Sequence, residues 1–249
     1  MTEIAVLFAA GAATALATGL GAIPVFMLGQ RAAGLRPVLL GLAIGVMGVV
    51  SVQGLLLPAF DEGAPVEVLL GVALGVGFLL AGRSFVHRRE PVVMGVSGRG
   101  AGTVVLVFGV LTVHSLPEGL AIGTAYASDT AGLSLFVIVA IAIHNIPEGT
   151  SVAVPMEAAG FSAKRQFWAA VLTSAPQPPG AVLSYLAVEQ VQALLPASFG
   201  FAAGAMLALI AWELLPHALA ERRWVAALGT ATLGGATMVG LGLVLGLGT

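Results

Sequence analysis

The stretch His114-Ser-Leu-Pro-Glu-Gly recurs thirty residues later as His144-Asn-Ile-Pro-Glu-Gly, and each copy lies near the middle of a long apolar segment. The two segments cover residues 101–127 and 131–157 and are joined by a short polar connection. Each is long enough to cross a bilayer as a helix, which takes about 20 mostly apolar residues. Neighbouring spans run in opposite directions, so both copies of the motif should lie at one depth. The sequence therefore predicts two central, antiparallel membrane helices.

The composition of the whole chain agrees with a membrane location. Hydrophobic residues make up 58% of the 249 residues, charged residues only 9%, and the mean hydropathy is +1.03. A soluble domain is about a quarter charged, so this chain could not cover a water-exposed surface. The net charge of −2 and the lack of a large basic face exclude nucleic acid as a partner. The chain has no cysteine, which excludes disulfides and thiolate metal sites.

Outside the two central segments, the chain contains further apolar stretches of spanning length. They lie at residues 3–29, 36–60, 65–87, 164–188, 196–219 and 225–247. We therefore predict an all-α integral membrane protein with eight transmembrane helices in a single domain over residues 1–249. The sequence Leu55-Leu-Leu-Pro-Ala in the second stretch is similar to Leu214-Leu-Pro-His-Ala in the seventh. This similarity suggests an inverted repeat of helices 1–3 and 6–8 around the central pair.

The positive charges predict the orientation in the membrane. All ten basic residues lie in four alternate loops or at their edges: Arg31, Arg36, Arg83, Arg88, Arg89, Arg99, Lys164, Arg165, Arg222 and Arg223. The other three loops contain only acidic charges, from Asp61, Glu62, Glu67, Asp129 and Glu189. By the positive-inside rule the basic loops are cytoplasmic. We expect a multi-pass protein of the plasma (inner) membrane with its N- and C-termini outside.

The two motifs contain ionisable His and Glu side chains, which are costly to bury in a membrane. An ionisable side chain inside a membrane span is a candidate functional residue. Within each motif His and Glu are four residues apart, so they share one face of the helix. His114, Glu118, His144 and Glu148 together provide two imidazole nitrogens and two carboxylates, a set that suits Zn²⁺ and accepts Fe²⁺, Mn²⁺, Cd²⁺ or Co²⁺.

The proline of each motif adds a second feature. Pro117 and Pro147 lack an N–H group, so the carbonyl groups of Val113 and Ile143 lose their usual helical partners. Broken helices with freed backbone oxygens recur in the ion sites of transporters. A structural His–Glu pair between helices is the alternative interpretation of one motif alone. Two copies at matching depth favour a metal site.

The paired H-[NS]-x-P-E-G motifs resemble those of the ZIP (Zrt/Irt-like) metal transporters. Ala17-Thr-Gly-Leu-Gly-Ala-Ile-Pro is similar to the first-helix pattern of that family, and the segment from Gly204 to Pro216 is similar to its seventh helix. The resemblance covers the whole chain and implies eight spans with both termini outside. It also implies transport of a divalent metal ion into the cytoplasm.

The resemblance assigns roles to individual residues. It implies that the two His and two Glu of the motifs form the primary transport site and that Ser115 and Asn145 contribute to a second, adjacent metal site. Gln177 stands where many relatives have a glutamate of helix 6, and Glu213 matches an acidic residue of helix 7 near the cytoplasmic exit. Because Ser115, Asn145 and Gln177 are neutral, we expect one transport site and not a two-metal centre.

We therefore expect alternating-access transport of a divalent metal ion, with Zn²⁺ as the transported substrate, and no enzymatic activity. The first alternative is an intramembrane zinc-dependent hydrolase that uses the same His/Glu cluster to activate water. The chain has no His-Glu-x-x-His run of the zincin type. A second alternative is a channel or receptor held together by a bound metal. Glycine-rich outer helix faces would permit a homodimer.

Overall fold

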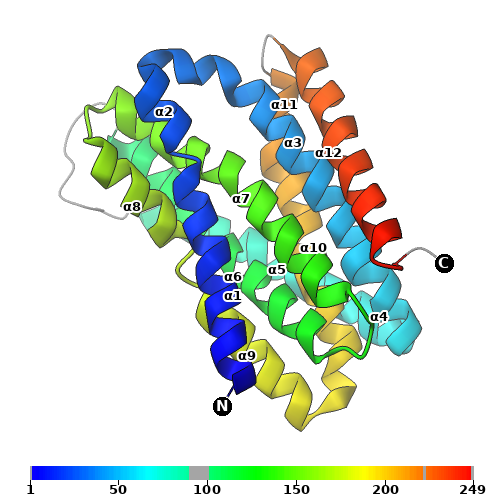
Figure 1. The fold of residues 1–249 in the computed structure, drawn as a ribbon. Helices are drawn as coiled ribbons and strands as arrows, with labels where there is room; N and C mark the ends of the chain where they lie inside the picture. The colour runs from blue at the N-terminus through cyan, green and yellow to red at the C-terminus, as the bar shows by residue number, and fades with distance from the viewer. Residues whose placement is uncertain (1, 90–100, 221–222, 248–249) are drawn as a thin grey trace.

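The computed structural model describes residues 2–89, 101–220 and 223–247 (Figure 1). These residues are helical almost throughout, and no β-strand occurs among them. The α-helices are α1 (Thr2–Leu20), α2 (Ile23–Leu28), α3 (Arg36–Val49), α4 (Leu57–Glu62), α5 (Pro65–Arg89), α6 (Ala101–Ala127), α7 (Leu133–Ala158), α8 (Ala163–Thr173), α9 (Gln177–Gln190), α10 (Leu195–Leu209), α11 (Leu215–Ala220) and α12 (Trp224–Val244). The prediction of an all-helical protein is confirmed.

Six helical stretches of the described residues are long and apolar enough to cross a membrane. They are Glu3–Leu28, Arg31–Glu62, Pro65–Val86, Leu133–Ala158, Gln192–Ala220 and Trp224–Val244. The two other predicted spans correspond to α6, a helix of 27 residues, and to α8 with α9, which a turn at residues 174–176 separates. A multi-pass membrane protein is thus confirmed, whereas the number eight and the inverted repeat stay predictions.

The long helices pack in pairs: α3 with α12, α5 with α10, α6 with α9 and α1 with α7. Glycine makes these pairs close. A side chain at Gly45 of α3 would overlap the backbone carbonyl group of Ala231 in α12, and one at Gly75 of α5 would overlap that of Phe201 in α10. Apolar helices gain no hydrophobic driving force from leaving lipid, so close backbone contact at small residues is what holds them together.

The helical irregularities lie away from the motif prolines. α6 and α7 continue as α-helices through Pro117 and Pro147. Wider π-helical segments occur instead at Val50–Leu56, just before Pro58, and at Ile210–Leu214, just before Pro216. A proline ring crowds the backbone of the preceding turn, and the extra residue of a π-bulge relieves that crowding. The two similar Leu-Leu-Pro sequences therefore share a backbone feature as well.

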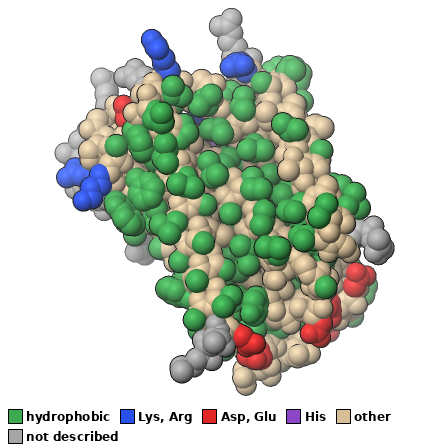
Figure 2. Space-filling model, viewed as in Figure 1, with side chains coloured by type: hydrophobic (Ala, Val, Ile, Leu, Met, Phe, Trp, Pro, Cys, Tyr) green, Lys and Arg blue, Asp and Glu red, His purple; other side chains and the backbone are tan. Residues whose placement is uncertain are grey.

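Charged side chains separate to the two ends of the molecule. Figure 2 shows Lys and Arg at the end where α2 and α8 lie, and Asp and Glu mostly at the end with the N-terminus and α4. We call these the basic end and the acidic end. Between them the face in Figure 2 is largely apolar. On α5, large side chains such as Leu70 and Leu74 are also exposed, at 59% and 66%. Such a belt fits the hydrocarbon core of a bilayer.

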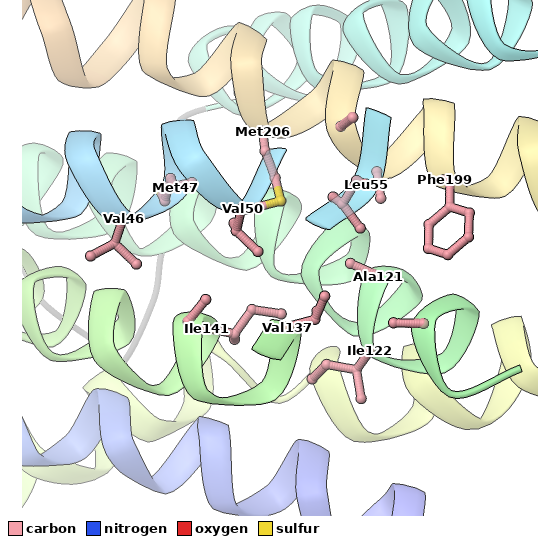
Figure 3. Packing of buried hydrophobic residues seen from close by; sticks show 14 of the residues in the cluster. Val46, Met47, Val50, Leu55, Ala121, Ile122, Val137, Ile141, Phe199 and Met206 are labelled. Atoms are coloured by element: carbon pink, nitrogen blue, oxygen red, sulfur yellow. The ribbon is translucent and has the colours of Figure 1, made fainter. Parts of the chain in front are cut away.

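A dry apolar core lies on the acidic side of the two motifs. Figure 3 shows side chains of α3, its π-helical continuation and α10 facing side chains of α6 and α7. The labelled members are almost fully buried: Val46, Met47, Val50, Leu55, Ala121, Ile122, Val137, Ile141, Phe199 and Met206. Along α6 its contributors come after Glu118, and along α7 they come before His144. The packed helices therefore separate the motifs from the acidic end.

Candidate metal site

The two motifs meet across the α6–α7 interface. His114 Nε2 lies 2.9 Å from Glu148 Oε1, and His144 Nε2 lies 2.7 Å from Glu118 Oε1. Each imidazole therefore contacts the carboxylate of the other helix and not the one a turn away on its own helix. All four side chains are buried, with at most 4% of any of them exposed. The structure therefore brings the two copies of the motif together, as the sequence predicts.

A backbone contact fixes the orientation of each histidine. His114 Nδ1 lies 3.1 Å from the carbonyl oxygen of Val110, and His144 Nδ1 lies 3.0 Å from that of Ala140. A carbonyl oxygen accepts but does not donate, so both Nδ1 atoms carry the proton and donate it. The Nε2 atoms then face the centre of the cluster. A histidine held in this way presents Nε2 as its ligand atom.

Three of the four motif residues satisfy the geometry of a shared ion. One ligand atom each from His114, Glu118 and Glu148 lies within 4.8 Å of the other two. His144 reaches the cluster through its contact with Glu118 and falls outside that group of three. Two carboxylates and one imidazole would suit zinc or another divalent transition metal.

Gln177 at the start of α9 connects the motifs to α1. Its Nε2 donates to Glu118 Oε2 over 2.7 Å, and its Oε1 accepts from Thr14 Oγ1 over 2.8 Å and from Asn145 Nδ2 over 3.2 Å. Asn145 Nδ2 also donates to the carbonyl oxygen of Thr14 over 2.7 Å. All of these side chains are fully buried. The polar groups of Gln177 and Asn145 are thus used within the protein.

Ser115 and Thr18 make further polar contacts near the motifs. Ser115 Oγ donates to the carbonyl oxygen of Leu111 over 2.9 Å within α6. Thr18 and Ser174 share a hydrogen bond of 2.7 Å between α1 and the turn before α9. Thr14 and Thr18 are not among the site residues predicted from the sequence. Their spacing of four residues on an otherwise apolar helix was the available signal, because it aligns two hydroxyl groups on one face.

The glycine that ends each motif brings these partners close. A side chain at Gly149 would overlap the carbonyl oxygen of Thr18 in α1, and one at Gly119 would overlap the backbone of Gln177 in α9. α1 therefore packs directly on α7, and α9 directly on α6. This close approach is the reason that Thr14 and Gln177 reach the His/Glu cluster.

A cavity of about 240 Å³ joins the cluster to the basic end. Glu148 is the only one of the four motif His and Glu residues among its lining residues. The lining continues through Ser151 and Pro155 of α7 to Glu213, His217 and Arg36. On the opposite side the apolar core of Figure 3 closes the approach. The cluster is therefore accessible from the basic end of the molecule.

Glu213 lies on this cavity and outside the His/Glu cluster. Its Oε2 atom is 3.1 Å from Arg83 Nε of α5, so the two form an ion pair. Its side chain is 24% exposed. Of the predicted site residues, seven are brought together around the motifs, while Glu213 lies farther along the cavity.

Comparison with known proteins agrees with the motif pattern. A family model described as ZIP zinc transporter matches residues 89–242, which is more than half of the chain. The chain belongs to the ZIP family. It is also similar to the zinc transporter GufA of Myxococcus xanthus, at 34% identity over 81% of this chain and 84% of the relative.

Two eukaryotic proteins with zinc transporter names are similar to the chain over shorter parts of their own length. The human zinc transporter ZIP11 is 35% identical over 57% of this chain and 44% of its own. An Arabidopsis thaliana protein designated as a candidate zinc transporter is 36% identical over 92% of this chain. The chain spans 37% of the length of that plant protein.

Proposed function

We propose that the chain transports a divalent metal ion, Zn²⁺, across the membrane into the cytoplasm. The observation that carries this proposal is the buried cluster of two His and two Glu. It lies at the deep end of a cavity that opens to the basic end. Membership of the ZIP family and the names of the relatives support zinc as the substrate. Because all of these names describe transporters, they favour transport over an intramembrane hydrolase.

We propose that His114, Glu118, His144 and Glu148 bind the transported ion. Nε2 of each histidine and the carboxylates supply the nitrogen and oxygen ligands that zinc takes. Cd²⁺, Fe²⁺, Mn²⁺ and Co²⁺ accept the same donors and are the alternative cargoes. Ser115, Asn145 and Gln177 are engaged in hydrogen bonds and uncharged, which supports a single transport site with these residues around it.

The mechanism that fits this arrangement is alternating access. The dry core of Figure 3 and the cavity at the basic end support a conformation that faces the cytoplasm. The core lies between α3 and α10 on one side and α6 and α7 on the other, so a shift between these two groups of helices would open the opposite path. An ion released toward the cytoplasm would pass Glu213 and His217.

The helix pairing supports the eight-span inverted repeat. Counted as eight spans, spans 1–3 are α1, α3 and α5, spans 4 and 5 are α6 and α7, and spans 6–8 are α9, α10 and α12. The inverted repeat exchanges span 1 with 6, 2 with 7, 3 with 8 and 4 with 5. It therefore converts the pair α1–α7 into the pair α9–α6. The same exchange converts α5–α10 into α12–α3, and all four pairs occur. The π-helical segments before Pro58 and Pro216 correspond in the same way.

We propose that the basic end is cytoplasmic and that both termini lie outside, in the plasma (inner) membrane. α1 begins and α12 ends on the side of the molecule where α4 lies, which agrees with this orientation (Figure 1).

Gly77 of α5 and Gly240 of α12 have open space beside them. Such positions allow close approach of a second copy, and a homodimer is the assembly that we propose. Cross-linking in membranes tests it.

Zinc influx into sealed proteoliposomes tests the function. The purified protein is reconstituted with a zinc-reporting dye inside, and wild type is compared with His144→Ala/Glu148→Ala. Wild type should give saturable influx that the variant loses. The exposed pair Asp61→Ala/Glu62→Ala removes two side chains at the acidic end and should keep influx. Absence of influx from folded, zinc-binding wild type would contradict the proposal.

A further inference from the structure

The ion pair between Arg83 and Glu213 lies where an ion would leave the cavity. Arg83 Nε of α5 is 3.1 Å from Glu213 Oε2 in the π-helical segment Ile210–Leu214. The side chains are 35% and 24% exposed, but the two contacting atoms are shielded from solvent. Arg83 lies in the last two turns of α5 (Pro65–Arg89), inside the apolar span Pro65–Val86. A charged side chain within a span is a candidate functional residue.

Glu213 and His217 have the chemistry of a metal-binding pair. They are four residues apart and both line the cavity that reaches Glu148. His217 Nδ1 contacts the carbonyl oxygen of Glu213 at 2.5 Å, which leaves Nε2 as the ligand atom, as in His114 and His144. We call Glu213 and His217 the exit pair. A carboxylate oxygen and an imidazole nitrogen facing one cavity would attract a departing zinc ion.

Arg83 approaches Glu213 from the side away from the cavity. It is absent from the residues that line the main cavity, whereas Glu213 lines it. The guanidinium group therefore partly neutralises the carboxylate without blocking the path. Another arginine, Arg36, does line the cavity. Together these cations oppose the retention of a dication at this end.

We infer that Arg83 sets the affinity of the exit pair, by holding the Glu213 carboxylate in an ion pair that a departing metal ion has to displace. This inference rests on the proposed function and names the residue that keeps release fast. A tight site at the exit would retain the ion and slow every transport cycle. With Arg83 in place, the exit pair is a weak and transient site.

Zinc binding to purified protein tests the inference in the background His114→Ala/His144→Ala, which lacks the two imidazoles of the transport site. The chain has no cysteine, so no thiolate competes for the ion. Adding Arg83→Gln should tighten the binding of about one zinc ion per chain roughly three- to tenfold. Adding Glu213→Gln to that variant should abolish the gain. Arg83→Lys, which keeps the charge, should show little gain.

Arg165→Gln is the matched control, because it removes one exposed cation from the same end of the molecule. A gain equal to that of Arg83→Gln would indicate a general field effect and overturn the inference. So would an unchanged zinc affinity in Arg83→Gln. Should Arg83→Gln misfold, the inference predicts that Arg83→Lys releases zinc in proteoliposomes at the wild-type rate. Wild-type influx tests the proposed function separately, so the two failures are distinguishable.

Discussion

Replacing Gln177 by leucine should weaken zinc binding although Gln177 is not needed as a ligand. The substitution removes the 2.7 Å hydrogen bond to Glu118 Oε2 and keeps a side chain of similar size. Thr14 retains its hydrogen bond to the carbonyl oxygen of Gly11 over 2.8 Å, and Asn145 retains its bond to the carbonyl oxygen of Thr14 over 2.7 Å. The substitution therefore removes the short hydrogen bond to the carboxylate of Glu118 and the longer one, of 3.4 Å, to Asn145 Oδ1.

The magnitude follows from the burial of that carboxylate. Glu118 is 0% exposed, so water does not replace the lost donor. A hydrogen bond to a charged group contributes about 1.5–3 kcal/mol. Because about 1.4 kcal/mol corresponds to a tenfold change in an equilibrium constant, zinc affinity should fall roughly 10- to 100-fold. Loss of a residue that orients a metal ligand has effects of this size.

The assay is competition for zinc between purified protein and a chelating dye. Gln53→Leu is the matched control, because Gln53 is also a membrane-helix glutamine but donates over 2.7 Å to the carbonyl oxygen of Leu247, away from the cluster. It should bind zinc as wild type does. A folded Gln177→Leu protein whose zinc affinity stays within about twofold of wild type would refute the reasoning.

Three further predictions concern packing, access and protons. Gly149→Ala should destabilise the α1–α7 contact by about 1–3 kcal/mol and lower the melting temperature, whereas Gly229→Ala, which meets open space, should not. The chain has no cysteine, so single cysteines can be labelled specifically. Ser151→Cys, which lines the cavity, should react with a water-soluble maleimide added on the cytoplasmic side, while the fully buried Val137→Cys should be protected. The opposite labelling would contradict the cytoplasm-facing conformation. Zinc should bind more weakly as the pH falls, because ligation needs unprotonated Nε2 atoms and ionised carboxylates; calorimetry in buffers of different ionisation enthalpy should detect the released protons.

The sequence predicted that the four motif side chains lie together, but it did not predict the contacts among them. His and Glu four residues apart share a helix face, so two antiparallel copies had to meet. The spacing did not reveal that His114 contacts Glu148 and His144 contacts Glu118, because that depends on how α6 and α7 are rotated about their axes. This rotation is set by close packing at Gly119 and Gly149 against α9 and α1, which is a tertiary effect.

The span boundaries were predicted from hydropathy, and the interruptions were not. The first predicted span, residues 3–29, contains a break between α1 and α2, where Thr150 Oγ1 donates to the carbonyl oxygen of Gly21 over 2.7 Å. A hydroxyl from α7 thus satisfies a carbonyl group at the end of α1. The predicted span 164–188 is interrupted before Gln177. Hydropathy does not mark the first break, which lies at small residues within an apolar stretch. The second break lies at Ser174-Ala-Pro, where Ser174 and Pro176 are a local signal that a window of spanning length averages out.

The two motifs share four of six residues but differ in environment, and this difference would give the proposed transport site a direction. Glu148 lines the cavity and pairs with His114. Glu118 is fully buried and held by both His144 and Gln177. An ion between the four side chains would therefore lose its contact with Glu148 first when it leaves toward the basic end. In the opposite conformation the apolar core next to Ile122 would have to open, and Glu118 would become the carboxylate nearest to the path. One nearly symmetric cluster can in this way serve two entrances in turn.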